Sequence, residues 1–334
     1  MNKAAVFQGF DAPLAVQDQA MPEPAPDGVV LRVTHCGICG SDLHMAHDPA
    51  FGAQPGDVFG HEFAGEVVAL GRNCTQLQVG DQVSVIPLGG CGQCQTCRAG
   101  EPAWCSEMSL QGGGYGQFTT TTERQCRKLP AGVTAEEGAL AEPLAVALHG
   151  VALSGLTAGD RVLILGAGPI GLATAFWARR LGATAVVVQD IHPEARDLAL
   201  AMGATDFLCT PDAPVQASDA ALGRKADIVF DCAGAPPLLA QAIDQVRVKG
   251  RIVILALSTR ETSFIPFAAV SKEVAVLTSA FFTLREYEAA LDALASGAPV
   301  AEALVTRTIS LDQLPEVFEG MKTGRSHGKV IVRP

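Results

Sequence analysis

A glycine-rich turn between an apolar run and an alanine-rich run constrains the fold of this chain more than any other feature. The apolar run covers residues 161–165, the turn reads Gly166-Ala167-Gly168-Pro169-Ile170-Gly171, and a helical pattern covers 170–181. Glycines at this spacing allow a tight turn, a close approach of a ligand to the backbone, and close packing of the helix on the strand. The turn alone is a weak signal. The strand before it and the helix after it predict a dinucleotide-binding unit, with phosphates at the start of the helix.

The sequence after this turn keeps alternating between strand and helix patterns. Strands are predicted at 185–189, 228–231 and 251–257, and helices at 193–202 and 237–246. This alternation requires a parallel sheet with helices on both faces, which is a doubly wound α/β fold. The alternation stops near Phe281, where we expect a helix at 284–295 and then a final strand at 329–332.

Asp190 ends the second predicted strand, about 20 residues after the turn, where a carboxylate accepts hydrogen bonds from an adenosine ribose. It would repel the extra phosphate of NADP, so NAD is the expected cofactor; a helix-capping role is the alternative for this residue. Arg196 lies near enough in the sequence to weaken the preference for NAD. Later strand ends should face the nicotinamide. The candidate cofactor-binding residues are Gly166, Gly168, Pro169, Ile170, Gly171, Asp190, Arg196, Ala233, Leu255 and Leu257.

The first 145 residues have a different texture, with short β-type runs separated by glycine and proline, at 29–33, 63–70, 82–86 and 117–121. This pattern predicts an irregular, mostly-β domain. A chain of 334 residues is also too long for one comfortable hydrophobic core. We therefore predict two domains and expect the C-terminal segment to return to the first. Residues 1–145 and 283–334 would form the mostly-β domain, and residues 146–282 the NAD-binding Rossmann domain.

Four of the ten cysteines crowd into one short segment, as Cys91-x2-Cys94-x2-Cys97-x7-Cys105. Four thiolates at this spacing suit a closed tetrahedral zinc site, which leaves no position for substrate and is therefore structural. An iron–sulfur cluster or four unrelated buried thiols are the alternatives. The first residues lack the apolar stretch of a secretory signal, so we expect a cytoplasmic protein without disulfides.

Charge and hydropathy limit the kinds of partner. The formal net charge is −11 and no basic stripe is present, which argues against nucleic acid. The longest apolar stretch, 162–178, is interrupted by glycines and Pro169 and bracketed by charged residues, so no membrane association is expected. Small-molecule ligands are therefore the expected partners.

Several further motifs, taken with the two above, carry a resemblance that spans essentially the whole chain. They are Cys36-Gly-Ile-Cys39-Gly-Ser41-Asp42-Leu-His44, Gly60-His61-Glu62, Gly80-Asp81-Gln82-Val83 and Glu142-Pro143-Leu144. Together they resemble the zinc-dependent medium-chain alcohol dehydrogenases, and the Glu-Pro-Leu-x-Val stretch is similar to the polyol (sorbitol) and 2,3-butanediol dehydrogenase branch. Threonine dehydrogenases tend to carry aspartate in place of Glu142. The resemblance implies a GroES-like catalytic domain, NAD, two zinc ions per chain, and a homodimer or homotetramer.

The resemblance also implies a catalytic site. Cys39 and His61 would bind a catalytic zinc, with Glu62 or Glu142 as third ligand; both glutamates stay candidates at this point. An oxidoreductase of this kind takes a secondary alcohol, vicinal diol or polyol to the ketone, through a zinc alkoxide that passes hydride to NAD. Ser41 and then His44 would carry the proton outward, and Asp42 would orient His61. A threonine-type 3-dehydrogenase and a non-catalytic dinucleotide-binding relative are the alternatives. The non-catalytic relatives lack the cysteine and histidine that stand here as Cys39 and His61.

Overall fold

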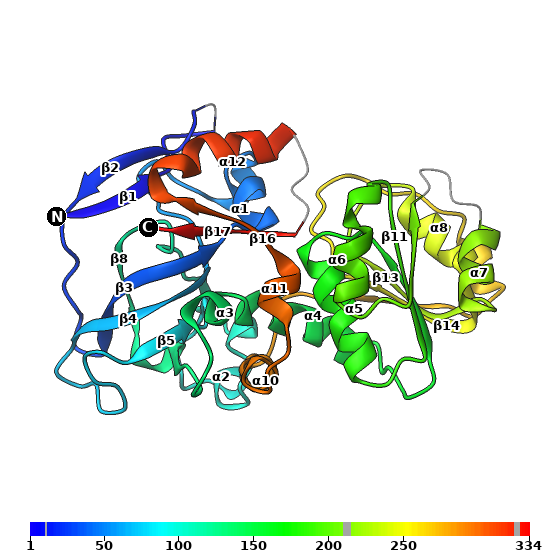
Figure 1. Ribbon diagram of the computed structural model, residues 1–334, viewed down its shortest axis with the longest axis horizontal. Helices are drawn as coiled ribbons and strands as arrows, with labels where there is room; N and C mark the ends of the chain where they lie inside the picture. The colour runs from blue at the N-terminus through cyan, green and yellow to red at the C-terminus, as the bar shows by residue number, and fades with distance from the viewer. Residues whose placement is uncertain (11, 210–214, 324–327) are drawn as a thin grey trace. The chain divides into compact units, whose positions relative to one another are not determined.

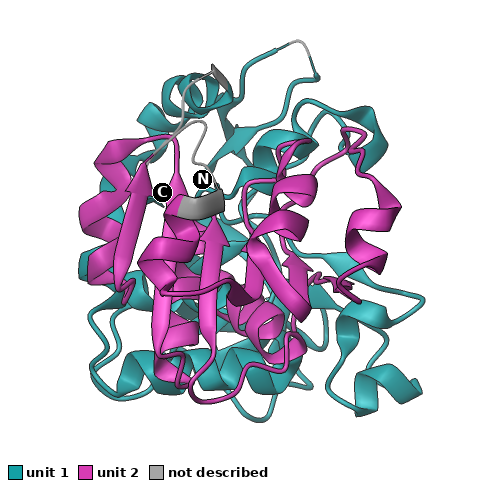
Figure 2. Ribbon diagram, turned by 90° about the vertical axis from the view of Figure 1, so that its right-hand side faces the viewer, with its two compact units in different colours: residues 1–142, 283–334 teal, residues 143–282 magenta. Residues whose placement is uncertain are grey.

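The computed structural model describes residues 1–10, 12–209, 215–323 and 328–334. The chain divides into two compact units, residues 1–142 with 283–334 and residues 143–282 (Figure 2). Within the described residues, no helix is both long and apolar enough to cross a membrane.

The first unit is built on strands. Its strands are β1 (Asn2–Val6), β2 (Ala15–Gln19), β3 (Gly28–Gly37), β4 (Glu62–Leu70), β5 (Gln82–Val85), β6 (Leu88–Gly89), β7 (Ser109–Leu110), β8 (Phe118–Thr122), β9 (Cys126–Lys128), β16 (Val305–Ser310) and β17 (Lys329–Arg333). Its α-helices are α1 (Gly40–Met45), α2 (Gln95–Arg98), α3 (Ala135–Ala139), α10 (Leu284–Ala295), α11 (Val300–Leu304) and α12 (Leu314–Thr323).

The main sheet of this unit joins residues from both ends of the chain. Its order is β16-β17-β3-β4-β5-β9, with β8 also paired to β3. The C-terminal strand β17 runs antiparallel to β3, with Ile331 opposite Gly37 and Val332 opposite Cys36. Strand β8 reads Phe-Thr-Thr-Thr-Thr and alternates between buried and less buried positions, as β-branched residues do on a half-buried sheet face.

The core of the first unit lies against this sheet, with the buried Phe7, Phe63, Tyr115 and Phe318 among its largest side chains. Helix α3 packs against β3, β4 and β5. A fully buried apolar side chain contributes about 1.5–3 kcal/mol, so this core stabilises the sheet whose strand ends carry the site residues.

The second unit is a doubly wound parallel sheet. Its elements in order are β10 (Arg161–Leu165), α5 (Pro169–Arg180), β11 (Ala185–Asp190), α6 (Arg196–Ala201), β12 (Asp206–Cys209), α7 (Val215–Leu222), β13 (Ala226–Asp231), α8 (Leu238–Gln245), β14 (Val246–Ile254), α9 (Pro266–Val270) and β15 (Ala275–Thr278), while α4 (Ala141–Leu153) begins at the end of the first unit. Among the described residues the sheet has six strands, in the order β12-β11-β10-β13-β14-β15.

All neighbouring strands of this sheet are parallel within the described residues, and Figure 1 shows α5 and α6 on one side of the sheet and α7 and α8 on the other. Strands β10 and β13 are buried along nearly their whole length, because helices cover both faces. The strand order reverses between β10 and β13, and the carboxyl ends of strands at such a switch point form the crevice that binds ligands. The predicted fold class, a mostly-β domain with a Rossmann domain, is therefore confirmed.

Two predicted elements differ in detail. Strand β14 ends at Ile254, so Leu255 and Leu257 lie in the loop after it and not in the strand predicted at 251–257. The helix predicted at 193–202 is split into a 3-10 turn at Pro193–Ala195 and α6, because Pro193 starts a tighter turn.

Candidate functional site

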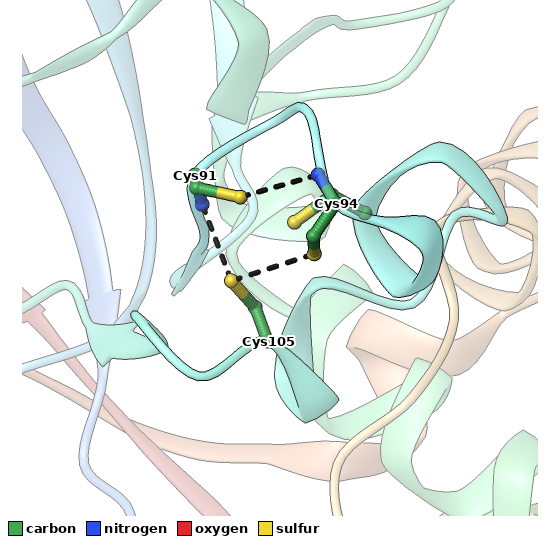
Figure 3. A group of neighbouring side chains, drawn as sticks. Cys91, Cys94 and Cys105 are labelled. Atoms are coloured by element: carbon green, nitrogen blue, oxygen red, sulfur yellow. Dashed lines mark hydrogen bonds between the residues drawn. The ribbon is translucent and has the colours of Figure 1, made fainter.

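The four clustered cysteines come together as the spacing predicts. Their sulfur atoms all lie within 4.8 Å of one another, and all four thiols are free. Figure 3 shows the side chains of Cys91, Cys94 and Cys105 converging on one point. Sulfur atoms bound to one zinc at about 2.3 Å lie about 3.8 Å apart, and Cys94 Sγ lies 3.7 Å from Cys105 Sγ. A disulfide would need about 2 Å, so the donor set fits a tetrahedral metal ion.

Backbone N–H groups point at these sulfurs. Cys94 N donates to Cys91 Sγ over 3.3 Å, Cys91 N donates to Cys105 Sγ over 3.4 Å, and Glu107 N donates to the same sulfur over 3.3 Å. The Thr96 hydroxyl, the Cys97 backbone and the neighbouring thiols lower the pKa of Cys94 to about 6, whereas burial raises the pKa of Cys97 to about 12. Donors arranged in this way stabilise thiolates, which are the form that binds metal.

A second cluster contains Cys39, His61 and Glu62, whose ligand atoms also lie within 4.8 Å of one another. Cys39 is the residue before α1, and His61 and Glu62 stand at the start of β4. His61 is 5% exposed and Glu62 is fully buried. A thiolate, an imidazole and a carboxylate provide three protein ligands, which is the number that a catalytic zinc takes while keeping its fourth position open.

Glu142 lies in the first turn of α4 and is not a member of this cluster among the described residues. Burial raises the pKa of Glu142 to about 7, with the Glu62 charge acting in the same direction and His61 against it. A carboxyl group that is half protonated near neutral pH is a weaker ligand than an ionised one.

Lys329 faces Glu62 from the C-terminal strand β17, and sequence reasoning missed it. Its Nζ donates to Glu62 Oε1 over 2.7 Å and to the Ile38 carbonyl over 3.2 Å, and its side chain is only 2% exposed. Burial acts to lower the pKa of Lys329, but the Glu62 carboxylate outweighs it and the net shift is upward. The only sequence signal was a lysine opening the otherwise apolar run Lys-Val-Ile-Val.

Asp42 contacts the cluster through the imidazole ring of His61. Its Oδ1 lies 3.3 Å from His61 Nδ1, which leaves Nε2 of the ring for a metal. Burial acts to raise the pKa of Asp42, but His61 and the donors around it bring the pKa below its usual value. Burial likewise acts to lower the pKa of His61, and the neighbouring Asp42 raises it well above its usual value.

The two residues expected to carry the proton lie on α1. Ser41 Oγ donates to Cys39 Sγ over 3.1 Å and lies 3.4 Å from His61 Nε2, so its hydroxyl touches two of the cluster residues. His44 packs its ring on Phe51, with centroids 6.2 Å apart. In the described part of the chain, no hydrogen bond links the His44 side chain to Ser41.

The glycine turn lies between β10 and α5. A Cβ at Gly171 would collide with the Gly166 carbonyl, whereas a Cβ at Gly168 would meet only open space. Gly168 precedes the first turn of the twelve-residue helix α5, and Pro169 and Ile170 open that helix. The turn therefore leaves a free approach to helix N–H groups, which fits a bound pyrophosphate.

Asp190 lies directly beside this turn. Its Oδ2 accepts from Ala167 N over 2.7 Å and its Oδ1 accepts from His192 N over 2.9 Å. Arg196 is engaged elsewhere in the same unit, because it donates to the Phe207 carbonyl over 3.0 Å and lies over the Phe207 ring at 5.4 Å.

The residues expected near the nicotinamide lie in different surroundings. Asp231, at the end of β13, accepts from Ala233 N over 3.1 Å and so fixes Ala233 beside the glycine turn. Leu255 packs against Gly150 of α4, and Leu257 is 50% exposed. The Asp231 contact is a second feature that the sequence did not single out.

Comparison with protein families gives two matches. Residues 25–131 match the model for the alcohol dehydrogenase GroES-like domain, and residues 169–296 match the model for zinc-binding dehydrogenases.

Similar proteins cover nearly the whole chain. "Probable D-xylulose reductase A" of Aspergillus terreus is 32% identical, over 97% of this chain and 96% of that protein. A crystal structure of a protein from Sinorhizobium meliloti 1021 bound to NADP is 33% identical with a TM-score of 0.92, and it covers 100% of this chain and 99% of that one. The structure of 2R,3R-butanediol dehydrogenase from Bacillus subtilis is 31% identical with a TM-score of 0.89, and it covers 100% of both chains.

Proposed function

Because this chain belongs to the zinc-dependent medium-chain alcohol dehydrogenases, we propose that it oxidises a secondary alcohol, vicinal diol or polyol reversibly to the ketone, with NAD as hydride acceptor. The cluster of Cys39, His61 and Glu62 carries this proposal. Its donor set suits a zinc ion with one open position, at which an alcohol oxygen can bind. Relatives that bear the names probable D-xylulose reductase and 2R,3R-butanediol dehydrogenase support the polyol and diol classes.

Glu62 is the third metal ligand in this proposal, and Glu142 is not. Glu62 reaches both other ligands, while burial raises the pKa of Glu142 to about 7. Bound zinc lowers the pKa of a hydroxyl group at its open position, which makes an alcohol easier to deprotonate near neutral pH. Glu142 then stands as a nearby carboxyl group able to exchange a proton at that pH.

The Ser41 hydroxyl is the first proton acceptor in this proposal. Its Oγ is close to both Cys39 Sγ and His61 Nε2, so it can form a hydrogen bond with a substrate oxygen bound at the open metal position. When Ser41 accepts the substrate proton, it releases its own. His44 follows three residues later on α1, on the same face of the helix, and its imidazole accepts the proton that Ser41 releases and passes it to solvent.

The second unit binds NAD by the glycine turn and Asp190. The turn and the N-terminus of α5 receive the pyrophosphate, and the Asp190 carboxylate, held by the Ala167 and His192 N–H groups, accepts from the adenosine ribose with its remaining lone pairs. Because Arg196 is already bonded to Phe207, it does not offset Asp190, and NAD is preferred over NADP. Ala233 and the loop at Leu255 and Leu257 are assigned to the nicotinamide end.

A homodimer through the edge of the second unit's sheet is the proposed assembly. Strand β15 is the last strand of that sheet, and three of its four residues are exposed. Ile265, Phe267 and Val270, at the helix α9 that precedes β15 in the sequence, are 73%, 75% and 72% exposed. An open strand edge and exposed apolar side chains are features that a second copy can cover. The ten free cysteines support a cytoplasmic location.

A spectrophotometric screen tests the activity. NAD reduction is followed with secondary alcohols, vicinal diols, polyols and threonine, and turnover is expected with a member of the first three classes. Cys39→Ser should abolish turnover while NAD binding, measured by calorimetry, stays within about twofold. Turnover in Cys39→Ser would overturn the assigned site, and activity with threonine alone would overturn the substrate class.

A further inference from the structure

The Asp42 carboxylate is satisfied by four donors in a fully buried position. Its Oδ1 lies 3.3 Å from both Gly60 N and His61 Nδ1, and its Oδ2 accepts from Cys39 N over 3.1 Å. The fourth donor is the hydroxyl of Tyr115, which lies 2.6 Å from Oδ2. Asp42 and Tyr115 both have no exposed surface.

Two of these four donors belong to the assigned zinc ligands. Asp42 accepts from the His61 ring and from the Cys39 backbone, so its position sets the orientation of both ligands. We propose that Tyr115 is a positioning residue of the catalytic metal site, whose hydroxyl fixes Asp42 and through it His61 and Cys39. This inference rests on the proposed function only in taking the cluster of Cys39, His61 and Glu62 as a zinc site.

The segment that carries Tyr115 is bound to the segment that leads into His61. Gly113 N donates to the Val58 carbonyl over 2.8 Å, Gly114 N donates to the Gly60 carbonyl over 2.8 Å, and Tyr115 N donates to the Phe59 carbonyl over 3.0 Å. The glycine-rich run at 112–116 is therefore tied along residues 58–60 by backbone hydrogen bonds. The Tyr115 hydroxyl adds a side-chain contact to this backbone pairing.

Gly60 keeps open the space that the Tyr115 ring occupies, and Gly114 allows the two backbone segments to approach closely. A Cβ at Gly60 would lie 2.6 Å from the Tyr115 ring, and Gly60 also has a φ of 84°, which favours glycine. A Cβ at Gly114 would lie 2.8 Å from the Gly60 carbonyl. The ring packs edge-on against Phe318, with centroids 6.4 Å apart. Phenylalanine would fill the same space, so packing does not account for the hydroxyl.

The hydroxyl contributes a strong contact. An O–H donor to an ionised carboxylate at 2.6 Å is in the range of charge-assisted hydrogen bonds, which are about twice as strong as neutral ones. Without it, Oδ2 keeps only the Cys39 N–H. Loss of a group that bonds a metal ligand directly lowers metal affinity about 10- to 100-fold. Tyr115 acts one contact further out, so we expect a loss of about tenfold.

The test compares two buried tyrosines of the first unit, the only tyrosines in the chain. Tyr115→Phe removes the hydroxyl at Asp42. Tyr287→Phe is the matched control, since Tyr287 is also fully buried and donates to the Val85 carbonyl over 3.0 Å. Each variant is titrated with a chelator while zinc release is followed, and the four-cysteine zinc serves as an internal reference.

Tyr115→Phe should lose the catalytic zinc at about tenfold lower chelator concentration, with release of the four-cysteine zinc unchanged. Tyr287→Phe should match the wild type at both sites. Cobalt substituted at the catalytic site should show altered visible bands in Tyr115→Phe alone. Equal release of the catalytic zinc from Tyr115→Phe and wild type would overturn the proposal.

A second measurement does not require Tyr115→Phe to fold. Wild-type protein labelled with 3-fluorotyrosine has two fluorine resonances, and Tyr287→Phe assigns them. The Tyr115 resonance should shift when zinc is removed and restored, and Cys39→Ser should abolish that shift. A Tyr115 resonance insensitive to the metal would refute the proposal. A protein that oxidises no alcohol but shows these metal effects would refute the proposed function and leave the role of Tyr115 standing.

Discussion

Replacing Lys329 by methionine should destabilise the first unit in a way that depends on Glu62. The two side chains are 2% and 0% exposed, and Nζ lies 2.7 Å from the carboxylate. With an effective dielectric constant of about 20, the attraction at this distance is about 6 kcal/mol before the cost of desolvation. Breaking a buried pair by removing one partner typically costs about 3–5 kcal/mol, because the remaining charge stays buried. Lys329→Met should therefore lower the free energy of unfolding of zinc-free protein by about 3–5 kcal/mol.

Zinc and Glu62 should both change this cost. A bound zinc ion gives the Glu62 carboxylate a second positive partner, so the loss should be smaller in zinc-loaded protein. In a Glu62→Gln background no buried charge is left unpaired, and the same substitution should cost at least about 2 kcal/mol less. Methionine keeps the length of the lysine stem, so the comparison isolates the ammonium group.

Urea unfolding followed by tryptophan fluorescence provides the assay. The chain has two tryptophans, Trp104 in the first unit and Trp177 in the second, so a Trp177→Phe background reports on the first unit. Four proteins complete the cycle: the background, each single substitution at Lys329 and Glu62, and the double variant. Equal costs of Lys329→Met in the two backgrounds, or a cost below about 1 kcal/mol in zinc-free protein, would refute the buried-pair reasoning.

Three further predictions concern other parts of the chain. Cys94→Ser should reduce the metal content from about two zinc ions per chain to about one, as measured by elemental analysis, and two ions retained would contradict the four-cysteine site. Asp190→Ala should lower the ratio of kcat/KM with NAD to kcat/KM with NADP by about tenfold. An unchanged ratio would mean that Asp190 only holds the glycine turn by hydrogen bonds. Burial acts to raise the pKa of Asp227, but hydrogen bonds from Arg224 and Arg247 outweigh it and the net shift is downward. The ionised Asp227 therefore stabilises the folded chain fully above the ordinary pKa of about 4. This stabilisation is lost as the pH falls through the lowered pKa of the folded state. Asp227→Asn should therefore cost about 1–2 kcal/mol at pH 7 and show a flatter loss of stability in acid; an acid limb as steep as that of the wild type would contradict this.

The parts of the fold that were predictable are those that local sequence determines. Strand β10 and helix α10 have the predicted bounds, 161–165 and 284–295. A buried parallel strand is one continuous apolar run, which is visible in the sequence. The capping box of Thr283 and Glu286 marks the start of α10. Strands β12 and β15 were not predicted, because each has only four residues and lies at an edge of the sheet, where burial imposes no clear pattern.

The same distinction between local and long-range features applies to the candidate site. Ligand candidates are visible in sequence because spacing and residue type reveal them, as for the cysteines at 91–105. Lys329 and Tyr115 were missed because their partners Glu62 and Asp42 are 267 and 73 positions away. A buried ion pair or a hydroxyl contact of that range depends on how the strands associate, and no local pattern encodes it. The choice between Glu62 and Glu142 depends on the same tertiary geometry.

The buried charges around the second cluster explain why Lys329 belongs beside a zinc site. With metal bound, Cys39, Asp42 and Glu62 carry three negative charges, Lys329 carries one positive charge, and His61 is neutral. The remaining two negative charges match a divalent cation, so the buried site is neutral when zinc is present. Lys329→Met leaves an excess negative charge, which Glu62→Gln removes. The double variant should therefore hold zinc more tightly at Cys39 and His61 than Glu62→Gln alone, even though it lacks both members of the ion pair, and weaker binding by the double variant in the chelator titration would contradict this charge balance.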